Sequence, residues 1–367
     1  MKAMKKIICV VGTRPEAIKM APVILALKKE PWADVRVLAT AQHREMLDQV
    51  LNFFRIEPDI DLNIMRPNQS LTELTGRLLL QLDEVFKAEK PDVVLVQGDT
   101  TTVMTVALAC FYHRIPIGHV EAGLRTWDIQ NPFPEEANRV IAGKLARWHF
   151  APTEGSRQNL LKDGIADKDI VVTGNTVIDA LLMAAKKDLE IGITIDPNKR
   201  LVLVTSHRRE NFGEPFRRIC QALKVLARKN PDIQFLYPVH PNPNVKNVAY
   251  EFLQEEENFI LCEPLDYAPF VAAMKRSVLI LTDSGGVQEE APALGKPVLV
   301  LREETERPEA VAEGVVELVG SDSEHIVQRV QCLLDDETEY KKMARGVSPY
   351  GDGKAAQRIV AVLREQA

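Results

Sequence analysis

Short apolar runs alternate with longer amphipathic stretches along the whole chain, and this pattern predicts a parallel α/β protein. Each run has four to seven residues, the length of a strand buried on both faces, and the segments between runs are long enough for crossover helices. The runs of the first half are 6–11, 35–40, 91–97, 115–120, 148–151 and 170–173. Those of the second half are 200–205, 233–239, 259–262, 278–282, 297–301 and 315–319.

Two domains account best for this series of runs. A chain of 367 residues exceeds the size at which a single hydrophobic core keeps growing. The polar segment 186–199 separates the two groups of strands, and we place the boundary within 173–179. We therefore expect two Rossmann-like, doubly wound domains, over residues 1–175 and 176–354. The amphipathic stretch 355–367 predicts a C-terminal helix that packs back on the first domain.

Composition and charge exclude several classes of protein. The net charge of −6, without a stripe of Lys and Arg, argues against a nucleic-acid partner. The five cysteines are scattered, which indicates reduced thiols rather than a disulfide framework or a zinc site. The apolar run after the basic N-terminus is too short for a signal peptide, and no stretch is long enough to span a bilayer. We expect a soluble cytoplasmic protein with no membrane partner.

Charged and polar residues follow nearly every strand-like run. Ligands of such sheets bind beyond the carboxyl ends of the strands, and ordinary loops do not require His, Arg, Asp or Glu at each of these positions. This pattern predicts two half-sites that face each other across an interdomain cleft. The residues concerned include Arg14, Lys19, His43, Asp99 and Glu121 in the first half, and His207, His240 and Asp283 in the second.

The segment 279–301 carries the most specific local pattern. A strand ends at Asp283, the chain turns through Gly285 and Gly286, and a short helix is expected to begin near Val287. A glycine turn before a helix presents free N–H groups to an anion. The acids at 289 and 290 could accept hydrogen bonds from sugar hydroxyls. An ordinary βαβ crossover is the alternative reading of this segment.

No cofactor or metal motif accompanies these residues. The chain has no P-loop and no Gly-x-Ser-x-Gly elbow. Its histidines are too far apart in the sequence to indicate a metal site. Gly351–Ala356 matches the dinucleotide-binding pattern Gly-x-Gly-x-x-Ala, but no strand precedes it, so we do not assign a dinucleotide site there. Carboxylates remain (Asp99, Glu121, Glu135 and Glu136), with the cations Arg14 and Lys19 and with His207. Each carboxylate alone could be a helix cap or a salt-bridge partner. Together they indicate elimination or substitution at the anomeric carbon of a nucleotide sugar.

Long strings throughout the chain resemble the non-hydrolysing UDP-N-acetylglucosamine 2-epimerases. The strings are 12–22 (GTRPEAIKMAP), 40–49 (TAQHREMLDQ), 98–102 (GDTTT), 119–125 (HVEAGLR), 134–139 (PEEANR), 173–179 (TGNTVID), 283–292 (DSGGVQEEAP) and 349–353 (PYGDG). The resemblance implies a GT-B fold, two Rossmann-like domains with the site between them. It implies conversion of UDP-GlcNAc to UDP-ManNAc for bacterial surface polysaccharide, through elimination of UDP to bound 2-acetamidoglucal and re-addition. It also implies no cofactor and no metal, and a homodimer formed through the first domain.

The same resemblance implies roles for individual residues. Asp99, Glu121 and Glu135 would handle the protons, and His207 would assist departure of UDP. The substrate would be bound by Arg14, Lys19, Leu265, Phe270, Ser284, Gly285, Gly286, Glu290 and Arg307. Leu265 stands where some relatives carry Gln, so base contacts there would come from the backbone.

The resemblance also implies a second UDP-GlcNAc, bound as an allosteric activator as in bacterial members of this family. The matching positions are Gln42, His43, Glu136, Arg208 and His240, while Glu45 and Asn68 replace Gln and Arg of some members. Other functions remain open from the residues alone. A GT-B glycosyltransferase with a UDP-sugar donor and a nucleotide-sugar sensor share the pocket, and a hydrolysing epimerase would release ManNAc and UDP.

Overall fold

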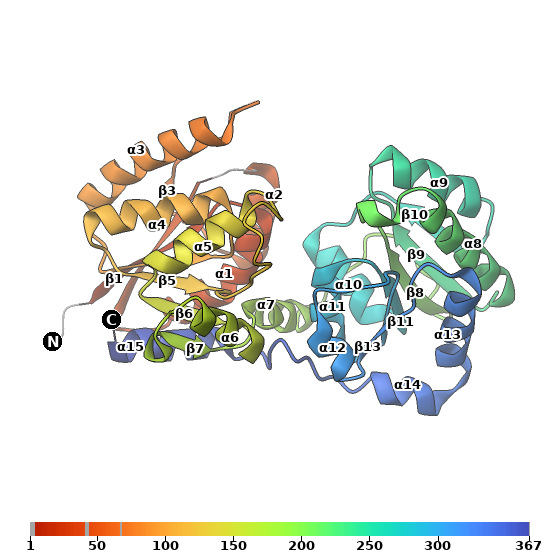
Figure 1. Cartoon of the computed structure of the whole chain (residues 1–367). Helices are drawn as coiled ribbons and strands as arrows, with labels where there is room; N and C mark the ends of the chain where they lie inside the picture. Colours follow the sequence, from red (N-terminus) through yellow and green to blue (C-terminus); the bar gives the residue numbers. More distant parts are fainter. Residues whose placement is uncertain (1–3, 41–43, 67, 367) are drawn as a thin grey trace. The chain divides into compact units, whose positions relative to one another are not determined.

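The chain folds into two α/β units, shown in the computed structural model in Figure 1. The structure describes residues 4–40, 44–66 and 68–366. The first unit comprises residues 1–180 together with 350–367, and the second comprises residues 181–349. The chain therefore leaves the first unit, builds the second, and returns for its last helix.

The first unit is built on a parallel sheet. Within the described residues the sheet has seven strands, in the order β3-β2-β1-β4-β5-β6-β7. Order reverses beside β1, which is the doubly wound arrangement that opens a crevice at the carboxyl ends of β1 and β4. The strands are β1 (Lys5–Val11), β2 (Ala33–Ala39), β3 (Ile60–Asp61), β4 (Val93–Gln97), β5 (Ile117–Val120), β6 (Trp148–Ala151) and β7 (Ile170–Val172).

Helices cover both faces of this sheet. One core cluster joins Ile8 and Val10 of β1 to the apolar stripes of α3 (Leu71–Glu89) and α4 (Thr101–His113), while α1 (Arg14–Leu27) contacts β1 and packs against α15 (Ala355–Gln366). The helices pack in two groups, with α4 against α3 and α5 in one and α1 against α2 and α15 in the other, as in a doubly wound sheet covered on both faces. The helices are α1 (Arg14–Leu27), α2 (Arg44–Phe54), α3 (Leu71–Glu89), α4 (Thr101–His113), α5 (Glu135–Leu145), α6 (Glu154–Lys162), the 3-10 turn η1 (Asp167–Asp169), α7 (Thr176–Ala185) and α15 (Ala355–Gln366).

The last helix is fixed to the first unit by its N-terminus. The carboxylate of Asp179 accepts the backbone N–H groups of Ala355 and Ala356, at 3.2 and 2.9 Å. A carboxylate at a helix N-terminus satisfies donors that the helix itself cannot. At the other end the Trp148 indole donates to Gln366, at 3.0 Å.

The second unit repeats the same construction. Its parallel sheet has the order β10-β9-β8-β11-β12-β13, again with the reversal beside its first strand. The strands are β8 (Arg200–Thr205), β9 (Ile233–Pro238), β10 (Phe259–Cys262), β11 (Leu279–Thr282), β12 (Val298–Val300) and β13 (Val316–Leu318). The helices are η2 (Arg209–Asn211), α8 (Glu214–Lys229), α9 (Pro243–Leu253), α10 (Tyr267–Arg276), α11 (Gly285–Glu290), η3 (Ala291–Leu294), α12 (Pro308–Ala312), α13 (Ser323–Asp335) and α14 (Glu337–Met343).

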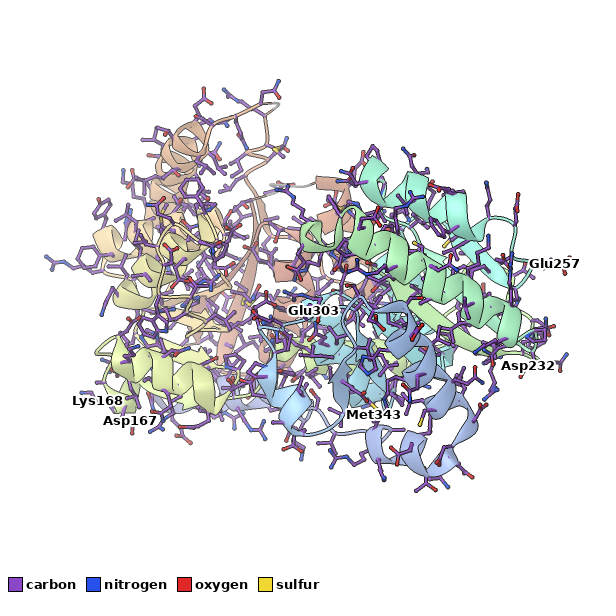
Figure 2. All side chains as sticks on the ribbon, turned by 45° about the vertical axis from the view of Figure 1, so that its right-hand side comes forward. Asp167, Lys168, Asp232, Glu257, Glu303 and Met343 are labelled. Atoms are coloured by element: carbon purple, nitrogen blue, oxygen red, sulfur yellow. The ribbon has the colours of Figure 1, made fainter. Side chains whose placement is uncertain are left out.

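The two ends of this second sheet are far apart, as Figure 2 shows. Asp232 and Glu257, which precede β9 and β10, lie well away from Glu303, which follows β12. The functional candidates of this unit follow the strands, so they belong to the Glu303 end.

The expected strands are confirmed at all twelve runs, with ends that differ by a few residues. The sequence did not predict β3, which has only two residues. In the described part of the chain, no helix has the length and apolarity needed to cross a membrane.

Candidate active site

In the first unit, the candidate residues gather at the carboxyl ends of three adjacent strands. β1 is followed by Arg14, the first residue of α1, β4 by Asp99, and β5 by Glu121. Because β1, β4 and β5 are neighbours in a parallel sheet, their carboxyl ends share one edge. The sheet thus brings together Asp99 and Glu121, as the sequence predicts.

Glu121 is the most firmly held of these carboxylates. The Lys19 ammonium lies 2.6 and 2.7 Å from its two oxygens, and the Asn175 amide donates to one of them at 2.9 Å. The amide of Gln97, at the end of β4, donates to the other. Glu121 is 9 % exposed and has a φ of 63°, a left-handed conformation that non-glycine residues rarely adopt. Such local strain is typical of functional positions, where the surrounding contacts enforce it.

Asp99 lies beside Glu121 in a different environment. Burial raises the pKa of the Asp99 carboxyl, the Arg139 guanidinium at 2.8 Å opposes the rise, and the Glu121 carboxylate adds to it. The Asp99 carbonyl accepts the Asn138 amide at 2.9 Å. One site therefore holds two carboxylates whose surroundings differ, a condition under which one can release a proton while the other accepts one.

The two acids at the start of α5, Glu135 and Glu136, differ in their burial and in their contacts. Glu135 is partly buried and close enough to raise the pKa of the Asp99 carboxyl further. Glu136 is 1 % exposed, and one of its oxygens accepts the backbone N–H groups of Thr126 and Trp127 at 3.1 and 3.2 Å. Glu136 thus holds the loop before α5 in place.

In the second unit, a buried carboxylate organises the loops after β8 and β11. Asp283 is fully buried and accepts the Ser206 hydroxyl at 2.8 Å, the backbone N–H groups of His207 and Arg208 at 2.9 Å, and the Asn211 amide at 3.1 Å. This one side chain fixes the segment that carries His207 against the turn that carries Ser284.

The glycine turn opens a helix, as the sequence predicts, although α11 begins at Gly285 rather than near Val287. A Cβ on Gly285 would lie 3.6 Å from the Arg208 guanidinium and 3.9 Å from that of Arg307. The Arg307 guanidinium is held in turn by the buried carboxylate of Glu289. Two guanidinium groups and a helix N-terminus thus converge on one short turn, an arrangement that favours a phosphate group.

His207 lies at the edge of this turn with its side chain 40 % exposed. Its ring stacks on that of His240, with 5.7 Å between centroids, and its Nδ1 is 3.4 Å from the Asp283 carboxylate. Burial lowers the pKa of His207, and the charge of Asp283 opposes the change. A lowered pKa keeps the imidazole neutral at pH 7, and in this form one ring nitrogen can donate a hydrogen bond while the other accepts one.

The remaining candidates are less informative. Leu265, in the loop after β10, and Phe270, in α10, are both partly buried, as is Glu290 at the end of α11. Gly286 is exposed at the turn. Gln42 and His43 lie outside the described residues, and Glu45 and Asn68 are exposed.

Sequence reasoning missed the neutral and cationic partners of the carboxylates. Gln97, Asn175, Asn138 and Arg139 received no role, although the last three lie within the strings that carry the family resemblance. Polar residues at the end of β4 and at the starts of α5 and α7 were the available signal.

Comparison with known proteins gives a consistent result. The family described as UDP-N-acetylglucosamine 2-epimerase matches residues 25–364. A Salmonella typhimurium protein named UDP-N-acetylglucosamine 2-epimerase is 56 % identical over 369 residues, which cover 98 % of each chain. The solved UDP-GlcNAc 2-epimerase of Neisseria meningitidis, bound to UDP-GlcNAc, is 50 % identical with a TM-score of 0.87, over 98 % of this chain and all of that one.

More distant structures share the architecture. The Methanocaldococcus jannaschii UDP-GlcNAc 2-epimerase, solved in complex with UDP-GlcNAc and UDP, is 35 % identical with a TM-score of 0.78, over 98 % of this chain and 99 % of that one. A glycosyltransferase of kitacinnamycin, 13 % identical with a TM-score of 0.68 over 99 % of each chain, shares the fold alone.

Proposed function

The chain belongs to the UDP-N-acetylglucosamine 2-epimerase family, and we propose that it interconverts UDP-GlcNAc and UDP-ManNAc without hydrolysis. The family match over residues 25–364 is the observation that carries this proposal. The two half-sites support it, because one offers paired carboxylates and the other a turn suited to phosphate. We further propose that the product supplies ManNAc units for surface polysaccharide.

The chemistry has to overcome a C2–H bond that is not acidic, because no carbonyl group is next to it. In the proposed route, UDP leaves C1 while a base removes the C2 proton, and 2-acetamidoglucal remains bound. UDP then adds back to C1 as a proton reaches the opposite face of C2. Two faces of one carbon require two positioned acid–base groups.

The first unit supplies candidates for these groups. Glu121 is fixed by three donors, and Asp99 lies beside it with its pKa raised by burial. The differing surroundings support a division of the two proton transfers between them, with Glu135 as the third candidate. Lys19, which pairs with Glu121, balances the negative charge of this group, and Arg14 is proposed to reach the diphosphate.

The second unit supplies candidates for holding UDP as it leaves. A leaving diphosphate develops negative charge, and preorganised donors lower the free energy of that state. We assign the diphosphate to Ser284, Gly285 and Gly286 with the Arg307 guanidinium, and assistance of its departure to His207. Glu290 would accept the ribose hydroxyls, and Leu265 and Phe270 would contact uracil.

The proposed reaction needs both half-sites to act on one ligand. The glycal and UDP must stay together between the two half-reactions, and water must be kept from the glycal. Release of either fragment would leave UDP and free 2-acetamidoglucal, and addition of water to the glycal in place of UDP would give the hydrolysis product ManNAc.

A second UDP-GlcNAc as activator is also part of the proposal, with Gln42, His43, Glu136, Arg208 and His240 as its contacts. The stacking of His240 on His207 supports a link between this site and the departing UDP. An activator of this kind must bind the active conformation more tightly than the inactive one, because equal affinity shifts no equilibrium.

We propose a homodimer formed through the first unit. Leu80 of α3 is 72 % exposed, and Phe111 and Tyr112 at the end of α4 are 60 % and 64 % exposed. His113 and Asp83, whose side chains are 2.9 Å apart, tie the end of α4 to α3, so these apolar groups belong to neighbouring parts of two packed helices. A second copy would cover them. Light scattering tests this: Leu80→Glu with Phe111→Glu should give a monomer, and a monomeric wild type would contradict it.

Product analysis tests the activity. Purified protein is incubated with UDP-GlcNAc, and the nucleotides and free sugars are separated by anion-exchange chromatography. We expect a mixture of the two UDP-sugars with no accumulation of free UDP. Free ManNAc with stoichiometric UDP would instead identify a hydrolysing enzyme. Unchanged UDP-GlcNAc would favour a glycosyltransferase or a sensor.

A further inference from the structure

A buried carboxylate outside the groups assigned above connects two loops of the first unit. Glu16 is 3 % exposed, and one of its oxygens accepts the backbone N–H groups of Gly12 and Thr13, at 2.6 and 2.9 Å. Its other oxygen accepts the hydroxyl of Thr100. Glu16 and Thr100 are 84 positions apart in the sequence, so this contact is a tertiary one.

A helix cap alone does not explain this arrangement. Glu16 completes a capping box with Thr13 at the start of α1, and Glu73 does the same with Ser70 at the start of α3. The box of α3 is exposed, and within the described residues Glu73 bonds the backbone and hydroxyl of Ser70 alone, at 2.8 and 3.0 Å. Capping therefore requires neither burial nor a second loop, and Glu16 has both.

The two connected loops carry residues of the proposed site. Arg14 follows Thr13, and Asp99 precedes Thr100. The loop after β1 is closely packed at Gly12, where a Cβ would lie 2.5 Å from the Thr40 hydroxyl. Glu16 thus connects Thr100, and with it the neighbouring Asp99, to the loop after β1.

Glu16 itself is not placed to contact a substrate. Both oxygens are occupied by donors of the protein, and the residue is buried. Burial raises the pKa of its carboxyl, while the Thr100 hydroxyl and the two N–H groups oppose this rise. Burying a carboxylate costs free energy, and this one is bonded to the residue next to Asp99. The arrangement therefore indicates that Glu16 helps to position Asp99.

We propose that Glu16 and Thr100 are positioning residues, which hold the Asp99 carboxyl at the distance from C2 that proton transfer requires. The inference rests on the proposed epimerase function and adds two residues to which no role has been assigned. Asp99 is held from three sides: by Thr100 in the chain, by the Asn138 amide on its carbonyl, and by Arg139 on its carboxylate. Removing the Thr100 hydroxyl breaks its hydrogen bond to Glu16, and with it the restraint on Asp99 that acts through Thr100.

Positioning predicts a specific kinetic effect. A shift of about 1 Å in a reacting group can lower a rate by roughly a hundredfold. We expect Thr100→Val to lower kcat for epimerisation by about ten- to a hundredfold, with KM for UDP-GlcNAc and Kd for UDP unchanged within about twofold. Thr100→Ser, which keeps the hydroxyl, should restore kcat. Glu16→Gln keeps an acceptor for the two N–H groups but presents an amide N–H to Thr100, and it should lower kcat by about tenfold.

Two variants separate positioning from capping. Thr100 also caps α4, because its hydroxyl accepts the Val103 N–H at 3.3 Å. Thr100→Val is therefore compared with Thr153→Val, which removes the hydroxyl that caps α6. Glu16→Gln is compared with Glu73→Gln in the exposed box of α3. Both comparison variants should keep wild-type kcat and lose only the thermal stability that the cap itself contributes.

The outcomes distinguish this inference from the function on which it rests. A wild type without epimerase activity would overturn both. An active wild type with unchanged kcat in Thr100→Val and Glu16→Gln would overturn the inference alone. So would equal losses of kcat in Thr153→Val and Glu73→Gln, or a loss in Thr100→Val that Thr100→Ser does not restore.

Discussion

Truncation of Asp283 should destabilise the second unit and weaken UDP binding. Asp283→Ala removes the acceptor of four donors, two of which belong to the buried residues Ser206 and Asn211. A buried donor left without an acceptor costs about 1–3 kcal/mol. The other two donors are the backbone N–H groups of His207 and Arg208, two residues that are only half-buried. Water can therefore replace part of the hydrogen bonding that these N–H groups lose.

The expected loss is about 4 kcal/mol, a large share of the stability of about 5–15 kcal/mol that is usual for a domain. At about 2–4 °C per kcal/mol for a unit of this size, the melting temperature of the second unit should fall by roughly 8–16 °C. Asp283→Asn keeps one acceptor oxygen and should lose about 1–2 kcal/mol. It therefore serves as the graded control.

Two signals separate the units during urea or thermal unfolding. The three tryptophans, Trp32, Trp127 and Trp148, all belong to the first unit, so their fluorescence reports on that unit. Far-UV circular dichroism reports on both. We expect the dichroism transition to move to lower temperature by more than the fluorescence transition. A dichroism transition within about 3 °C of wild type would refute the reasoning, because it would show that the Asp283 hydrogen bonds contribute little.

Further predictions concern the protons, the acid stability and the phosphate contact. Asp99→Asn and Glu121→Gln should remain folded, with a lower melting temperature for Glu121→Gln because Lys19 loses its charged partner. Both should lose more than about a hundredfold in kcat, and wild-type turnover in either would remove that residue from the mechanism. Burial lowers the pKa of His119 to about 4 and that of His149 to about 3, so below about pH 6.5 the unfolded chain binds protons that the folded chain does not. The free energy of unfolding should therefore fall as the pH drops from about 6.5 towards 4, by up to about 3 kcal/mol for His119. In urea titrations, the free energy of unfolding of His149→Leu should depend less steeply on pH than that of wild type. Equal slopes of the two pH dependences would contradict this. Arg307→Ala should raise Kd for UDP by about tenfold in calorimetric titrations, and an unchanged Kd would place the diphosphate elsewhere.

The sequence predicted most of the fold because the strands are buried on both faces. Such strands form apolar runs that end where the strand ends, and the runs at 148–151 and 200–205 match β6 and β8 at both ends. The strand β3 has two residues at the edge of the sheet, too few to form a run. The helix α11 begins with Gly285 and Gly286, which have no side chains and therefore give no helical periodicity.

The site was predictable in its positions and not in its contacts. Strand ends share one edge, which is why Asp99 and Glu121 could be placed together from the sequence. Their partners come from distant positions: Asn175 is 54 residues from Glu121, and its neutral amide carries no distinctive signal. Lys19, expected to bind the substrate, pairs with Glu121, and its contact with substrate stays a prediction.

Asp283 shows the same limit in the second unit. In the sequence it is one residue of a glycine turn. Its burial and its hydrogen bonds depend on Ser206 and Asn211, which lie 77 and 72 positions earlier, and only the folded chain brings them together.

The central claim is that C2 of the sugar loses and regains a proton while UDP leaves and returns. Proton NMR of UDP-GlcNAc incubated with the protein in D₂O tests this claim most directly. We predict that UDP-ManNAc appears with deuterium at C2, and that the C2 proton of the remaining UDP-GlcNAc is also replaced. UDP-ManNAc that retains the C2 proton would contradict the account, because inversion would then proceed without proton exchange at that carbon.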